Sequence, residues 1–108
     1  SKGGLAVKMP DGSVKVTIPD KVTETLIIEC KNYCKSTVTE TAQIRAQLEA
    51  AQQANKGYTL VVPPGAKVER TLARQINDYN FSIGNPPQSG ILTFDEATGQ
   101  LGKWSTTP

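Results

Sequence analysis

Two short apolar runs on either side of one helical segment restrict the folds that are open to this chain. Residues 26–30 and residues 58–62 are dense in apolar side chains and have the length of buried strands. Between them, Thr37 followed by Glu40 matches a capping box, and Lys56-Gly57 is a typical helix end. A strand, a helix and a second strand in this order predict a right-handed crossover between two parallel strands.

The flanking segments add further strands and a second helix to this unit. Residues 5–9 and 14–18 are apolar runs separated by the turn sequence Pro10-Asp11-Gly12-Ser13, so with residues 26–30 they predict a three-stranded antiparallel meander. A second helix is expected over residues 68–79, and residues 91–94 and 100–104 have the pattern of a hairpin. We therefore expect one α/β domain over residues 1–108. Its mixed β-sheet would consist of the meander followed by helix, strand and helix.

The residue types that the sequence lacks narrow the possible chemistry. The chain has no histidine, which excludes a Ser-His-Asp triad, a Cys-His pair, a histidine-based ribonuclease and an HExxH zinc site. Its two cysteines, Cys30 and Cys34, are too few for a structural zinc site. We expect both to be free thiols in a reducing compartment. Any catalysis would then depend on carboxylates, lysine and a metal ion.

The net charge and the length of the apolar runs limit which partners the chain can have. The net charge of +2 is compatible with a polyanionic partner but does not require one. No apolar run approaches the roughly 20 residues of a membrane-spanning helix, so we expect no membrane contact by the folded domain.

Acidic residues occur at the ends of two predicted strands. Asp20 follows residues 14–18, and Glu29 and Lys31 lie near the end of the run at 26–30. A hairpin that turns near Glu24-Thr25 would place Asp20 directly opposite Glu29, because both are equally far from the turn. Cross-strand partners lie roughly 4.5–5.5 Å apart and like charges there repel, which favours a divalent cation between the two carboxylates. Oxygen ligands suit Mg²⁺ or Mn²⁺ and fit Zn²⁺ less well.

Side chains alternate along a strand, so Lys31 should point to the same side as Glu29, and Cys30 to the other. An alternative is a surface hairpin with ordinary salt bridges. That alternative predicts exposed carboxylates, each beside a basic partner.

The order Pro19-Asp20, then Glu29-x-Lys31 at the end of the next strand, then a helix and a strand, resembles the PD-(D/E)xK, or restriction-endonuclease-like, nuclease superfamily. The resemblance covers about residues 14–76. Four short sequence segments are more specifically similar to the nuclease domains at the C-terminal ends of bacterial polymorphic and contact-dependent growth inhibition toxins. The segments that carry this similarity are Ile18-Pro19-Asp20, Ile28-Glu29-Cys30-Lys31-Asn32, Gln43-Ile44-Arg45 and Leu60-Val61-Val62.

The resemblance implies a role for each site residue. Asp20 and Glu29 would bind the metal ion, with the backbone carbonyl of Cys30 as a further ligand, and Lys31 would orient or activate the attacking water. Gln43 would support the site, as in branches where a tyrosine follows four residues later. This chain has Gln47 at that later position, so the resemblance carries over Gln43 and not Gln47.

The resemblance also implies a function. The expected activity is a Mg²⁺- or Mn²⁺-dependent endonuclease that hydrolyses DNA in target bacteria, with cleavage of RNA, most plausibly tRNA, as the alternative. The domain would be exported as the C-terminal part of a larger toxin, would act in the target-cell cytoplasm and would be blocked by a cognate immunity protein. Many members have a helix before the first strand, so we expect either that this helix is dispensable or that the chain is a fragment. A catalytically inactive binding relative and a housekeeping repair nuclease remain open alternatives.

Overall fold

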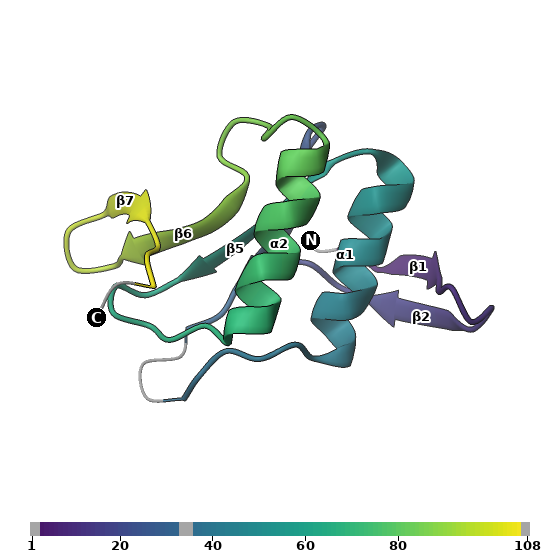
Figure 1. Cartoon of the computed structure of the whole chain (residues 1–108), viewed down its shortest axis with the longest axis horizontal. Helices are drawn as coiled ribbons and strands as arrows, with labels where there is room; N and C mark the ends of the chain where they lie inside the picture. Colours follow the sequence, from purple (N-terminus) through teal and green to yellow (C-terminus); the bar gives the residue numbers. More distant parts are fainter. Residues whose placement is uncertain (1–2, 33–35, 107–108) are drawn as a thin grey trace.

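The computed structural model describes residues 3–32 and 36–106, which form a five-stranded sheet, a two-stranded sheet and two helices (Figure 1). Within these residues, β3 to β7 lie in chain order in the larger sheet, and β1 pairs with β2 in the smaller one. The expected α/β class with a mixed sheet is confirmed. The elements are β1 (Leu5–Lys8), β2 (Val14–Thr17), β3 (Lys21–Val22), β4 (Leu26–Cys30), α1 (Ala42–Ala54), β5 (Gly57–Val62), α2 (Arg70–Ser82), β6 (Gly90–Asp95) and β7 (Gln100–Lys103).

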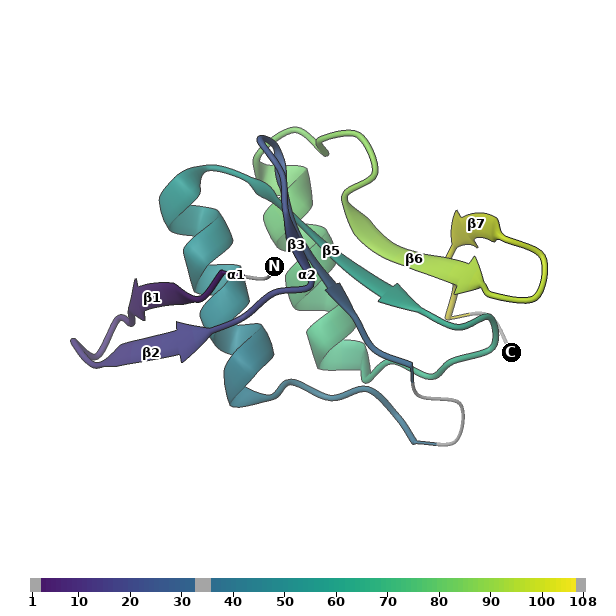
Figure 2. The ribbon, with the colours of Figure 1, turned by 180° about the vertical axis from the view of Figure 1, so that it is seen from behind.

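Three parallel strands form the centre of the larger sheet. β4 pairs with β5 from Leu26 opposite Gly57 to Cys30 opposite Val61, and β5 pairs parallel with β6. Antiparallel strands complete both edges, with β3 beside β4 and β7 beside β6. Both helices lie on one face of this sheet, α1 against β4 and β5 and α2 against β5 and β6, and Figure 2 shows the opposite face. The expected parallel crossover and C-terminal hairpin are both present.

The N-terminal strands do not form the predicted three-stranded meander. β2 pairs with β1, from Leu5 opposite Thr17 to Lys8 opposite Val14, and this pair packs against α1. Pro19 follows soon after β2 and has no N–H to donate, so it ends the strand before it can join the larger sheet. The antiparallel partner of β4 is instead the short strand β3. The prediction of a single antiparallel meander is therefore wrong.

Helix α1 begins later than the capping pattern predicts. Its N-cap is Thr41, whose side-chain oxygen accepts a hydrogen bond from the N–H of Ile44 at 3.1 Å. The predicted capping pair, Thr37 and Glu40, lies before the helix. The reason is that Val38 forms a β-bridge to the segment that precedes α2, which keeps this stretch extended.

The other helix ends also differ by a few residues. α1 ends at Asn55, whose left-handed backbone (φ 55°) supplies the cap expected of Lys56-Gly57. Gly57 instead begins β5, where a Cβ atom would lie only 2.8 Å from the side chain of Leu26. Helix α2 starts two residues later than predicted because Glu69 caps it, accepting hydrogen bonds from two backbone N–H groups of the first turn.

On β4, the side chains that face the helices include an acid, Glu29. Along β4, Ile27 and Glu29 point to the helix-covered face, and the register places Glu29 beside Leu60 of β5. The neighbours of Glu29 in this row are otherwise apolar, and each buried aliphatic or aromatic side chain stabilises the fold by about 1.5–3 kcal/mol. The fully buried side chains under the helices include Ile27, Ile44, Tyr58, Leu60, Leu72 and Ile76.

Candidate active site

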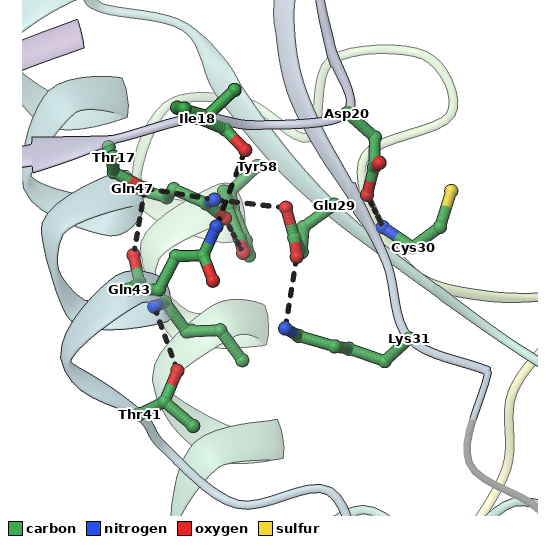
Figure 3. Close-up of polar contacts among 11 residues, drawn as sticks. Thr17, Ile18, Asp20, Glu29, Cys30, Lys31, Thr41, Gln43, Gln47 and Tyr58 are labelled. Carbon is green, nitrogen blue, oxygen red and sulfur yellow. Dashed lines mark hydrogen bonds and ion pairs between the residues drawn. The ribbon is translucent and has the colours of Figure 1, made fainter. Parts of the chain in front are cut away.

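The hairpin β3–β4 brings Asp20 and Glu29 together. Lys21 pairs with Ile28, so the preceding residue, Asp20, lies opposite Glu29. The turn is the predicted one, because the N–H of Thr23 donates to the carbonyl of Leu26 at 2.8 Å across Glu24-Thr25. The Asp20 carboxylate also accepts a hydrogen bond from the backbone N–H of Cys30 at 2.8 Å (Figure 3). The expected register of the two acids is confirmed.

Glu29 and Lys31 form a mostly buried ion pair. The Nζ atom of Lys31 lies 3.1 Å from Oε2 of Glu29, and their side chains are 15 % and 5 % exposed. Cys30, between them, is exposed, so the alternation predicted from the strand period is correct. A surface salt bridge would have left Glu29 in water. Because taking a charge out of water costs several kcal/mol, its burial requires compensating contacts.

Gln47 supplies the main compensating contact, although the sequence interpretation had not included it in the site. Its Nε2 donates to Oε1 of Glu29 at 2.9 Å and to the hydroxyl of Thr17 at 3.1 Å. Its Oε1 accepts a hydrogen bond from the hydroxyl of Tyr58 at 2.7 Å. Gln47, Tyr58 and Thr17 are at most 2 % exposed. Figure 3 shows the four side chains converging from β2, β4, α1 and β5.

A sequence signal for Gln47 exists. It lies three residues after Ile44 and four before Ala51, on the face of α1 that is buried. A polar residue on such a face must find buried partners. Tyr58, in a neighbouring strand, provides the hydroxyl that the resemblance would have placed on α1, but its proximity to Gln47 depends on the tertiary fold.

Gln43 lies on the same helix face, one turn earlier. Its Nε2 donates to the backbone carbonyl of Ile18 at 3.3 Å, and its own carbonyl accepts from the hydroxyl of Thr17 at 3.5 Å. Its side chain is exposed and joins the segment after β2 to α1. Figure 3 shows it on the side of α1 that faces Glu29 and Lys31.

The pKa of the Tyr58 hydroxyl depends on burial and on the charges of the two acids. Burial is the main cause that raises the pKa of the Tyr58 hydroxyl well above its ordinary value of 10.0, and the charges of Glu29 and then Asp20 raise it further. The hydroxyl therefore stays protonated near neutral pH and donates to Gln47.

The donor chemistry fits a hard divalent cation. Asp20 and Glu29 would hold it, with the backbone carbonyl of Cys30 as a third oxygen ligand. Within residues 3–32 and 36–106, no group of three or more His, Cys, Asp or Glu side chains is placed to bind a metal. Two carboxylates are nevertheless a normal protein contribution to a Mg²⁺ site, because this ion keeps several waters and takes further ligands from substrate phosphates.

Two depressions lie beside individual site residues. Asp20 lines a depression of about 330 Å³ together with Gly4, Leu5 and Pro19. Lys31 lines a smaller one of about 130 Å³ at the ends of β4 and β5, beside Phe94. In open α/β sheets, ligands bind at the carboxyl ends of parallel strands.

Other residues weighed in the sequence have local explanations. Asp11 accepts hydrogen bonds from the N–H and the hydroxyl of Ser13, as expected of a turn residue. Arg45 pairs with Glu40 at 3.3 Å, away from the carboxylates. Cys34, the second predicted free thiol, falls outside the described residues.

No helix in the part of the chain that the structure describes is long and apolar enough to cross a membrane. Comparisons of the chain with known protein families, curated proteins and solved structures found no match. A functional assignment therefore depends on the residues and geometry described above.

Proposed function

We propose that this domain is a metal-dependent endonuclease in which Asp20 and Glu29 bind the cation and Lys31 assists the attacking water. The observation that carries this proposal is the position of Glu29. Its side chain is 5 % exposed, lies opposite a second acid and has an ammonium group 3.1 Å away. Taking a carboxylate out of water costs several kcal/mol, so its burial at this position supports a functional role.

The residues have separate tasks in phosphodiester hydrolysis. When bound, Mg²⁺ or Mn²⁺ lowers the pKa of a water ligand and neutralises phosphate oxygens. Asp20 and Glu29 would fix the position of that ion, and the carbonyl of Cys30 would add a neutral ligand. Lys31 places a compact positive charge beside the attacking water and the phosphate, where negative charge develops as the water oxygen bonds to phosphorus and the P–O bond breaks. Gln43, whose side chain is exposed on the adjacent face of α1, would support the site.

The proposed substrate is DNA, with tRNA as the alternative. The similarity of four short segments to toxin nuclease domains supports a role as the C-terminal part of an exported toxin. Such a domain acts in the cytoplasm of the target bacterium, and an immunity protein protects the producer.

Cleavage of supercoiled plasmid and of total tRNA, side by side, tests this function. Wild-type protein should nick plasmid with Mg²⁺ or Mn²⁺ and not with EDTA. Lys31→Ala should reduce the rate by about 10²-fold or more, the usual effect of removing one electrostatic contact in an active site. Lys103→Ala is the matched control, because Lys103 is exposed on β7. Cleavage of tRNA alone would mean that the substrate is RNA and not DNA. A folded protein that cuts neither plasmid nor tRNA would contradict the proposal.

A second candidate function, binding of nucleic acid or protein without catalysis, is favoured by one observation. Both oxygens of Glu29 already have a protein partner, Gln47 for Oε1 and Lys31 for Oε2, so the network is also consistent with a packing role. The two candidates differ in metal binding. A ligand at 100 times its Kd stabilises the native state by about 2.7 kcal/mol, so Mn²⁺ should raise the melting temperature of the nuclease and leave that of a pure binder unchanged.

A further inference from the structure

We infer that Gln47 and Tyr58 act as a unit that positions Glu29 for the cation. This inference rests on the proposed metal-dependent function and deepens it. The Tyr58 hydroxyl donates to the Gln47 side chain at 2.7 Å, and the Gln47 amide donates to Glu29 at 2.9 Å. Both residues are fully buried and out of reach of a substrate, so they are positioning residues and not catalytic ones.

The hydrogen bonds of Gln47 permit only one orientation of its amide. Its Oε1 accepts from Tyr58, and its Nε2 donates to Glu29 and Thr17. A reversed amide would place its oxygen against the Glu29 carboxylate, where two acceptors repel. Both N–H bonds of the amide are therefore used, and the direction of the chain from Tyr58 to Glu29 is fixed.

This orientation divides the two oxygens of Glu29 between two partners. Oε1 is held by the amide, whereas Oε2 faces the ammonium group of Lys31 at 3.1 Å. The partners of Oε1 come from α1 and, through Tyr58, from β5, so the carboxylate is held by elements other than its own strand. A ligand that is held in this way before the cation arrives loses little freedom on binding, which strengthens the site.

A role in packing alone makes a different prediction. Gln47 and Tyr58 are both fully buried, so removing their polar atoms should lower the melting temperature whatever the site does. Only a positioning role predicts that the affinity for the cation falls as well, and that the two substitutions have overlapping effects because they act on the same carboxylate.

The test is calorimetric titration of the full chain with Mn²⁺ for wild type, Gln47→Met, Tyr58→Phe and the double variant. Outer partners of metal ligands typically contribute about 10–100-fold to metal affinity. We expect a Kd increase of this size for Gln47→Met and a smaller one for Tyr58→Phe, with the double variant no weaker than Gln47→Met. Tyr58→Phe removes a single oxygen and keeps the ring, so it stays informative if Gln47→Met does not fold.

Tyr79→Phe is the matched control. Its hydroxyl also donates inside the molecule, to the carbonyl of Lys56, but it belongs to no contact of Glu29. Its Mn²⁺ affinity should equal that of wild type. If Gln47→Met and Tyr58→Phe lowered the melting temperature but bound Mn²⁺ as tightly as wild type, the positioning role would be wrong while the nuclease proposal stood. If wild type itself bound no Mn²⁺, both would fail.

Discussion

Two antiparallel hairpins close the two edges of the large sheet, and both carry acidic residues, but only one is a candidate site. In β3–β4, Glu29 lies in the row that faces the helices and is 4 % exposed. In β6–β7, Asp95 accepts a hydrogen bond from the N–H of Ala97 at 3.0 Å inside the turn, and Glu96 is exposed. The backbone of the turn accounts for Asp95. It does not account for Glu29, whose Oε1 is hydrogen-bonded to Gln47 of α1, 18 positions away. An acidic residue is informative when local structure leaves its position unexplained.

The largest expected difference between the hairpins is in activity. Glu29→Gln keeps the size of the side chain and removes its charge, so metal-dependent plasmid cleavage should fall by about 10³-fold, the upper range for one electrostatic contact in an active site. Asp95→Asn, in the other hairpin, keeps an oxygen that can accept from the N–H of Ala97 and should leave the rate unchanged. Rates are measured with each variant at the same Mn²⁺ concentration. Equal rates for the two variants would mean that burial of Glu29 serves packing alone.

A smaller difference is expected in stability. Ile27 of β4 is 2 % exposed, whereas Leu101 of β7 is 52 % exposed. Ile27→Ala should reduce the free energy of unfolding by about 3 kcal/mol, because it removes buried methyl groups and leaves a cavity. Leu101→Ala should change it by no more than about 0.5 kcal/mol, as for most surface positions. Urea titration of both variants measures these values. A large loss from Leu101→Ala would show that the second hairpin is covered in solution.

The smallest expected effect is on the pH dependence of stability, and it concerns Glu69, an acid whose position is explained by its hydrogen bonds to the backbone of α2. The N–H groups of Thr71 and Leu72 lower the pKa of Glu69 from its ordinary value of 4.5. Because the folded pKa is the lower one, this contribution to stability is present above pH 4.5 and is lost as the pH falls through the folded pKa. Glu69→Gln should therefore lower the melting temperature at pH 7 and matter less at pH 3.

Thermal melts of wild type and Glu69→Gln across this pH range measure the effect. Glu24→Gln is the control, because Glu24 is exposed in the turn between β3 and β4 and does not precede a helix. A Glu69→Gln difference that did not narrow in acid would argue against the capping role.

Local rules predicted the parts of the fold that depend on short-range geometry. The opposition of Asp20 and Glu29 followed from a tight turn and the two-residue period of a strand, and the parallel crossover followed from element order. The predicted start of α1 was wrong. The sequence at Thr37 matches a capping box, but the β-bridge of Val38 to Val68 keeps this segment extended. A capping pattern shows which side chains could cap a helix at that position. Where the helix starts also depends on the tertiary contacts of the preceding segment.

The partners of Glu29 could not be predicted in the same way. Gln47 and Thr17 are 30 positions apart in the chain, and neither belongs to a recognisable motif. Thr17 comes near α1 only because β1 and β2 leave the large sheet, which the sequence did not predict. The sequence therefore predicted the position of the two acids relative to each other, and it did not predict the side chains that hold Oε1 of Glu29.

The spread of these contacts along the chain has a consequence for folding. Oε1 of Glu29 on β4 is held by Gln47 of α1, which is held in turn by Thr17 of β2 and Tyr58 of β5, so its surroundings are incomplete until these four elements have come together. Contacts between residues far apart in sequence form late, because long loops must close first. The carboxylate should thus remain hydrated in partly folded chains and become enclosed only at the final stage. A chain that is synthesised or transferred in an extended form would carry no assembled site on the way.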